Sequence, residues 1–216
     1  TCIAPDYILV NNHVKDELIS MIKKNIISTY GNSSIKSNSY GRIINKNNLV
    51  RLKEILNKNN VEFGGKIEEE KLFIEPTLII EPDLNSEIMN DEIFGPILPI
   101  LSYENENEIQ IIIEKNPSPL AFYIFSKNQK FIDKLVQNNK FGGCVVNDTL
   151  IHYLNPNLPF GGIGVSGMGA YRGKFSFDTF THYKPILEKK SMIDLPFRYG
   201  PYPESFSLIK KILDKL

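Results

Sequence analysis

The cysteine near the start of the chain is the side chain best suited to nucleophilic chemistry. It stands in the segment Thr1-Cys2-Ile3-Ala4-Pro5-Asp6-Tyr7. A thiolate is a strong nucleophile where the cysteine is accessible and its pKa is lowered. A lone cysteine can equally be a small apolar core residue, so Cys2 needs the support of other motifs. Cys144 lies within an apolar run, and we predict that it is structural.

A second candidate segment joins an acid to an aromatic ring. It reads Asp91-Glu92-Ile93-Phe94-Gly95-Pro96. The ionised carboxylate of Glu92 can only accept hydrogen bonds, which suits the recognition of a ligand that carries donors. The simpler alternative is a solvated carboxylate beside a turn, because acidic side chains are rarely buried.

A third candidate segment is rich in glycine and follows an aromatic residue, Phe160. It contains a literal G-x-G-x-x-G pattern at Gly162, Gly164 and Gly167. A dinucleotide-binding loop of that pattern follows a strand and opens a helix. Residues 155–159, which include two prolines, predict no strand here, so we reject that interpretation. The alternative for Phe160 alone is a core ring beside a glycine-rich turn.

Taken in this order, the three segments resemble the aldehyde dehydrogenases, and in particular their class 3 (fatty aldehyde) branch. Residues 123–126, 143–148 and 171–182 resemble that branch too, and the resemblance covers residues 1–200. Two positions depart from the pattern of the branch. Arg172 stands where histidine is usual, and Cys144 replaces a small apolar residue.

The resemblance implies a role for each candidate residue. Cys2 would be the catalytic nucleophile, and its backbone N–H would help to hold the oxyanion. Glu92 would accept hydrogen bonds from the hydroxyls of the nicotinamide ribose, because a carboxylate can take both donors of a vicinal diol. Phe94 would lie against the nicotinamide of NAD or NADP. Phe160 would form an apolar wall of the substrate site near the reacting carbon.

The implied reaction is oxidation of medium or long aliphatic, or aromatic, aldehydes to carboxylic acids by a homodimer. The family also uses a general-base Glu and an oxyanion Asn, which we expect upstream of this chain together with the dinucleotide-binding domain. We therefore expect residues 1–216 alone to be inactive. Two other hypotheses stay open: a non-catalytic fragment or assembly module, and a different cysteine enzyme such as a thiol transferase.

The amino-acid composition limits the classes of partner that we expect this chain to bind. The 216 residues are 42% hydrophobic and 23% charged, with a net charge of zero, so there is no basic field for nucleic acid. Two cysteines make no disulfide framework and favour a reducing compartment. Three scattered histidines predict no metal site. The sequence shows no apolar run long enough for a membrane span, and we expect a cytoplasmic protein.

Helix-like and strand-like periods alternate along the chain, which favours an α/β fold with an open, mostly parallel sheet and flanking helices. Helical spacing of apolar residues predicts helices at 16–27, 47–59, 104–115 and 129–138. Short apolar runs predict strands at 7–10, 61–65, 78–80, 97–102, 120–125 and 143–147. The run at 120–125 is nearly continuous, which is typical of a strand covered on both faces.

The C-terminal part of the sequence has a different character. We predict a catalytic (thiol) domain at residues 1–170 and a tail at residues 171–216. Alternating aromatic and polar residues predict a strand at 175–183, which by the resemblance would bridge a dimer. Residues 204–216 predict a basic amphipathic helix. Packing against its own domain is the usual fate of such a helix, and weak, salt-sensitive contact with an anionic membrane surface is the alternative.

Overall fold

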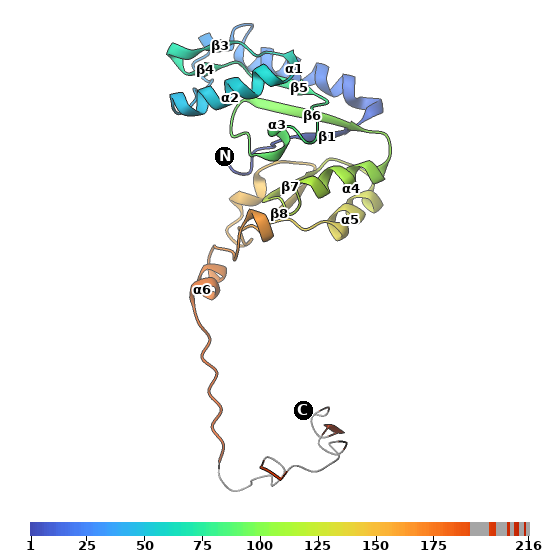
Figure 1. Cartoon of the computed structure of the whole chain (residues 1–216), viewed down its shortest axis with the longest axis vertical. Coiled ribbons are helices and arrows are strands. Elements are labelled where there is room, and N and C mark those ends of the chain that lie inside the picture. Colours follow the sequence, from blue (N-terminus) through green and yellow to red (C-terminus); the bar gives the residue numbers. More distant parts are fainter. Residues whose placement is uncertain (191–198, 202–206, 208–209, 212–213, 215–216) are drawn as a thin grey trace. The chain divides into compact units, whose positions relative to one another are not determined.

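The computed structural model describes residues 1–190, 199–201, 207, 210, 211 and 214 (Figure 1). The chain divides into two units, Thr1–Phe180 and Thr181–Leu216. The first unit carries all the strands and helices discussed below. In the second unit, residues 181–190 adopt no regular secondary structure. The predicted amphipathic helix at 204–216 lies largely outside the described residues.

A four-stranded mixed sheet forms the centre of the first unit, in the order β1-β6-β5-β2. β1 (Ile8–Asn11) runs parallel to β6 (Ile97–Tyr103), which runs parallel to β5 (Thr77–Ile80). β2 (Val61–Phe63) closes one edge and is antiparallel to β5. The predicted α/β fold with flanking helices is therefore confirmed, with one antiparallel edge strand.

Helices cover both faces of this sheet. Neighbouring residues of a strand point to opposite faces, so each central strand contributes side chains to two cores. Ile79 and Leu101 pack in one core with α2 (Lys46–Lys58) and α3 (Glu87–Asn90). Leu78 and Ile100 pack in a second core with Ile19 of α1 (Lys15–Tyr30). Burial on both sides explains why β5 and β6 are almost entirely apolar.

A separate two-stranded parallel sheet pairs β7 (Ala121–Ile124) with β8 (Gly143–Val146). α4 (Glu106–Lys115) and α5 (Gln129–Asn138) lie beside it in Figure 1. The prediction that the first of these strands is covered on both faces is wrong, since residues 121–123 are only half-buried. Within the described residues this sheet has two strands only.

Two small elements of the fold are not predicted from sequence. β3 (Ile67–Glu68) and β4 (Phe73–Ile74) form a short antiparallel hairpin around a 3-10 turn at Glu69–Lys71. The four residues of α3 (Glu87–Asn90) form a single helical turn. Neither element is long enough for its hydrophobic period to be seen.

The prediction of a strand at residues 175–183 is wrong for its first part, where α6 (Lys174–Phe180) forms instead. Local side-chain bonds favour the helix over an extended conformation. Lys174 Nζ lies 2.6 Å from Asp178 Oδ2, one helical turn away, and Ser176 Oγ accepts a 2.7 Å hydrogen bond from the Arg172 N–H. The first bond stabilises one exposed face of the helix, and the second gives a backbone N–H near the helix start a partner. The alternation of aromatic residues in the sequence does not reveal either bond.

The first unit ends at Phe180, and the domain boundary at residue 170 stays a prediction. No helix among the described residues is long and apolar enough to cross a membrane.

Candidate active site

The segment that carries Cys2 is held in place by its neighbour. Ile3 is almost fully buried, whereas the Cys2 thiol is exposed to solvent. The carbonyl of Thr1 accepts a 3.0 Å hydrogen bond from the Ala4 N–H, which closes a tight turn around the cysteine. The thiol is therefore accessible in this chain and is carried by an anchored backbone.

A tyrosine of β7 supports this turn from the other side. The Tyr123 hydroxyl donates a 2.6 Å hydrogen bond to the Ile3 carbonyl. Burial raises the pKa of Tyr123, the Leu150 backbone N–H opposes this rise, and the nearby Cys2 adds to it. The phenol is therefore protonated at neutral pH and remains a donor to the Cys2 segment.

The segment that carries Glu92 and Phe94 is tied directly to the Cys2 segment. Asp6 Oδ1 accepts a 3.1 Å hydrogen bond from the Ile93 N–H. From α2, the Arg51 guanidinium donates to the Ile93 carbonyl at 2.6 Å and to the Glu92 carbonyl at 3.5 Å. Ile93 is buried, and it anchors a loop whose two flanking side chains, Glu92 and Phe94, are exposed.

The loop geometry explains the glycine that follows Phe94. A Cβ at Gly95 would lie 2.6 Å from the side chain of Leu52, which is fully buried in α2. No side chain fits there without displacing the core. Phe94 itself has a φ of 47°, a left-handed conformation that is unusual for an aromatic residue and that turns its ring outward.

Glu92 and Phe94 line a cavity of about 400 Å³ beside the Cys2 segment. Its other lining residues include Thr1 and Ala4 on either side of the cysteine turn, together with apolar and polar groups: Pro5, Asp6, Tyr40, Gly41, Arg42, Ile43, Ile44, Asn48, Ile74, Gly95 and Pro96. A cavity of this size is within the range of small-molecule sites. An exposed carboxylate for a diol and an exposed ring for a flat heterocycle fit a nicotinamide riboside.

Phe160 lies in a different place, outside this cavity. It exchanges two backbone hydrogen bonds with Tyr171, of 2.9 and 3.1 Å, and its ring contacts those of His152, Tyr153 and Tyr171. The His152 ring lies 6.1 Å from that of Tyr123, which bonds to Ile3. The Cys2 segment thus reaches the cavity of Glu92 through Thr1 and Ala4, and it is linked to the aromatic cluster of Phe160 through Ile3, Tyr123 and His152.

Several residues that shape the site were not singled out from sequence. Asp6, Arg51 and Tyr123 act through hydrogen bonds to backbone atoms distant in sequence. The only signal for Asp6 is a charged residue within an otherwise apolar segment. His152 is not predicted from sequence to belong to the site. Burial, followed by the charge of Arg172, lowers its pKa. Its two ring nitrogens are buried without a hydrogen-bond partner.

Cys144 lies in a different environment from Cys2. Cys144 is half-buried on β8, and burial raises the pKa of its thiol, which disfavours the reactive thiolate. Within residues 1–190 and the few described beyond them, no group of three His, Cys, Asp or Glu side chains is placed to hold a metal.

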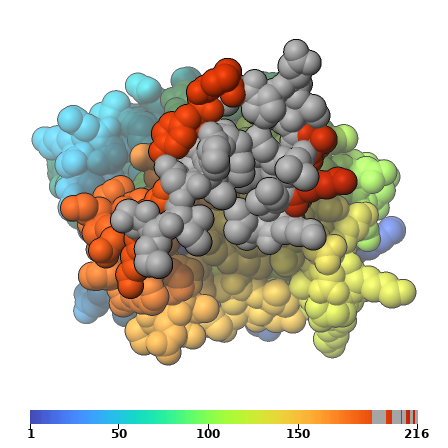
Figure 2. All heavy atoms as spheres, turned by 90° about the horizontal axis from the view of Figure 1, so that it is seen from below, coloured from blue at the N-terminus to red at the C-terminus, as the bar shows by residue number. Residues whose placement is uncertain are grey.

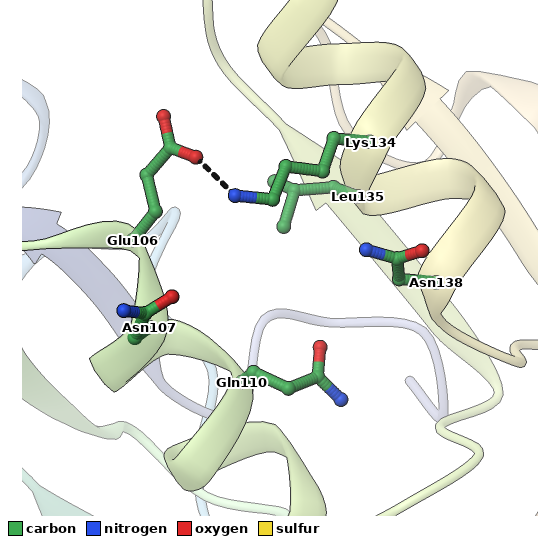
Figure 3. A pocket seen from close by; sticks show the side chains of 6 residues that line it. All are labelled: Glu106, Asn107, Gln110, Lys134, Leu135 and Asn138. Atoms are coloured by element: carbon green, nitrogen blue, oxygen red, sulfur yellow. Dashed lines mark hydrogen bonds and ion pairs between the residues drawn. The ribbon is translucent and has the colours of Figure 1, made fainter.

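A smaller hollow of about 330 Å³ lies between α4 and α5 (Figure 3). Lys134 Nζ and Glu106 Oε2 pair across it at 2.6 Å, and Asn107, Gln110, Leu135 and Asn138 complete its lining. None of these residues belongs to the motifs or to the groups around Cys2, so we assign no part of the chemistry to this hollow.

Asp6 offers a test of how the two site segments are joined. We expect Asp6→Ala to lower the free energy of unfolding by about 1–3 kcal/mol, because the buried Ile93 N–H loses its acceptor. Asp6→Asn keeps an acceptor oxygen and should lose much less. Urea unfolding of both variants measures the difference, and equal losses would show that this hydrogen bond is unimportant.

The same aspartate has a defined dependence on pH. Burial raises the pKa of Asp6, the Ile93 N–H opposes this, Glu92 adds to it and Arg51 opposes it. A carboxyl whose pKa is raised on folding contributes stability at low pH and loses that contribution as the pH rises through the folded pKa. Relative to Asp6→Asn, the unsubstituted protein should therefore gain stability as the pH falls into the acidic range.

Comparison with known proteins identifies the family. The family model described as "Aldehyde dehydrogenase family" matches residues 1–186. The chain is 45% identical over 212 residues to 4,4'-diaponeurosporen-aldehyde dehydrogenase of Staphylococcus aureus, covering 97% of this chain and 46% of that protein. It is 42% identical to aldehyde dehydrogenase family 3 member A2 of Mus musculus, covering 95% and 43%.

A solved structure agrees with the sequence relatives. The substrate-bound state of Staphylococcus aureus AldH superposes with a TM-score of 0.83 at 44% identity, over 99% of this chain and 47% of that one. This chain therefore belongs to the aldehyde dehydrogenase family, with family 3 members among its relatives, as the three motifs predicted. It spans about half the length of the curated relatives it matches.

Proposed function

We propose that the protein containing this chain oxidises aldehydes to carboxylic acids with NAD or NADP. The observation that carries the proposal is the position of Cys2. An exposed thiol on an anchored turn is tied through Asp6 and Ile93 to a loop that presents Glu92 and Phe94 to a cavity. Membership of the family supports the same reaction.

In this proposal the residues of the chain bind and position the reactants. The Cys2 thiolate adds to the aldehyde carbon, and its backbone N–H donates to the oxygen that becomes negatively charged. Glu92 accepts hydrogen bonds from the ribose hydroxyls, and Phe94 limits the positions of the nicotinamide ring. The bound nicotinamide supplies a hydride acceptor. Water then releases the carboxylic acid from the cysteine.

The finer features are also proposals. We infer apolar substrates, namely medium or long aliphatic and aromatic aldehydes, because Phe160 and its neighbouring rings form an aromatic surface beyond Cys2. We propose a homodimeric, cytoplasmic protein with at most weak contact with membranes; one relative is named as dimeric and NADP-preferring. The alternative of an assembly module relied on a strand at 175–184 and on the helix predicted at 204–216. α6 replaces the first part of that strand, and the predicted helix lies largely outside the described residues.

The test is the formation of NADH or NADPH by the longest gene product that contains this sequence, with a panel of aldehydes. We expect cofactor reduction with at least one medium-chain aliphatic or aromatic aldehyde, such as hexanal or benzaldehyde, together with equimolar carboxylic acid. A folded protein that binds the cofactor but reduces it with no aldehyde would overturn the proposal.

A further inference from the structure

Four aromatic side chains gather around Phe160 and form an open box, which we call the aromatic box: His152, Tyr153, Phe160 and Tyr171. The Tyr153 and Phe160 rings meet edge to face with centroids 5.3 Å apart, and the Phe160 and Tyr171 rings are 5.4 Å apart. Tyr153 and Tyr171 are 44% and 45% exposed. Figure 2 shows this part of the chain, in light to deep orange, at the surface of the molecule.

Arg172 already occupies the faces of two of these rings. Its guanidinium carbon lies 4.4 Å from the centroid of the Tyr153 ring and 5.9 Å from that of Phe160. Hydrogen bonds hold both the guanidinium and the backbone of Arg172 in place. The guanidinium donates to the Asn155 carbonyl at 2.8 Å, and the backbone N–H donates to Ser176 Oγ at 2.7 Å. The backbone also adopts a φ of 101°, which is strained for a residue with a side chain.

The charge of Arg172 is not cancelled nearby. Every ion pair found among the described residues joins a lysine to a carboxylate, and none includes Arg172. His152 adds no second positive charge at neutral pH, because burial and Arg172 both lower its pKa. One full positive charge therefore remains on the rings.

The chemistry of the box depends on that charge. The faces of aromatic rings attract organic cations, and boxes built from such rings recognise quaternary ammonium groups. With a guanidinium on the Tyr153 and Phe160 faces, a second cation would meet both a blocked face and like-charge repulsion. Specificity of this kind comes from a repulsive element that rejects the wrong partner.

The box also lies near the nucleophile. His152 contacts the ring of Tyr123, with centroids 6.1 Å apart, and the Tyr123 hydroxyl bonds to the Ile3 carbonyl next to Cys2. A short aldehyde bound at Cys2 with its tail toward Phe160 would bring that tail to the aromatic box.

We propose that Arg172 is a specificity-determining residue, which fills the aromatic box and so excludes cationic aldehydes in favour of neutral ones. The proposal rests on the aldehyde-oxidising function proposed above. It concerns the tail of the substrate and leaves the reaction at Cys2 unchanged.

The catalytic test uses two aldehydes of the same shape. Betaine aldehyde carries a trimethylammonium group where 3,3-dimethylbutanal carries a neutral tert-butyl group. We expect the unsubstituted protein to favour the neutral aldehyde in kcat/KM by at least about 10-fold, and Arg172→Gln to reduce that ratio by about 10-fold. Arg172→Lys keeps the charge and should keep most of the preference.

A matched control is available two residues away. Lys174→Gln removes an exposed charge that is paired with Asp178 and contacts none of the rings of the box. Its ratio for the two aldehydes should match that of the unsubstituted protein. If Arg172→Gln and Lys174→Gln change the ratio equally, or if neither changes it while both aldehydes are oxidised, the proposal is overturned.

A binding measurement separates this proposal from the proposed function. Tetramethylammonium chloride is titrated into the same protein and followed by NMR of the aromatic residues. We expect Arg172→Gln to bind it at the box, the unsubstituted protein not to bind it, and the pKa of His152 to rise in the variant. This result with no oxidation of any aldehyde would leave the box intact and overturn only the proposed function. Binding of tetramethylammonium to the unsubstituted box would overturn the exclusion itself.

Discussion

Replacing Cys2 with serine should abolish aldehyde oxidation, with a loss in kcat of at least about 10³-fold, as expected for removal of a nucleophile. A serine hydroxyl is a far weaker nucleophile than a thiol unless a base activates it. Cys2 is exposed, and exposure alone does not activate a serine hydroxyl in its place. The measurement is NAD(P)H formation by the Cys2→Ser variant, with cofactor binding measured separately to show that the site is otherwise intact.

Cys144 provides the matched control for this experiment. It is half-buried on β8, and burial raises the pKa of its thiol. Cys144→Ala should therefore keep most of the activity, and limited treatment with iodoacetamide should label Cys2 first and remove activity in parallel. Preferential labelling of Cys144, or an active Cys2→Ser enzyme, would contradict the assignment of the nucleophile.

Replacing Glu92 with glutamine should slow hydride transfer. The loss of a charge-assisted hydrogen bond to a ribose costs about 1.5–3 kcal/mol, which corresponds to about 10- to 140-fold. The backbone of the loop is held by Asp6 and Arg51 through the N–H and carbonyl of Ile93. The substitution therefore changes the side chain and leaves the loop in place.

Two comparisons give this prediction its specificity. Asp91→Asn removes the adjacent exposed carboxylate, which does not line the cavity, and should leave hydride transfer almost unchanged. Ester hydrolysis at Cys2 without cofactor should be less affected by Glu92→Gln than hydride transfer is. If ester hydrolysis collapsed while hydride transfer survived, Glu92 would act as a base and its role as a ribose ligand would be wrong.

Elements with a strong hydrophobic period were predictable from sequence. The helix expected at 129–138 is α5, with the same bounds, and the helix expected at 47–59 is α2, shifted by one residue at each end. Their apolar residues repeat every turn and face a core. The elements that were missed, the β3–β4 hairpin and α3, are two to four residues long, too short to show a period.

The sequence by itself indicated the family, because Cys2, Glu92 and Phe94 each stand in a short motif and these motifs follow the order of the family. The roles of these residues are predictions from that resemblance. Only the tertiary structure decided how they meet. Asp6 binds a backbone N–H 87 positions away, and Tyr123 binds a carbonyl 120 positions away. The cation on the Phe160 ring, and α6 in place of a strand, likewise emerged only from the fold. The physical reason is that periodicity records which face of an element is buried, whereas single hydrogen bonds and ring contacts between distant segments leave no repeating pattern.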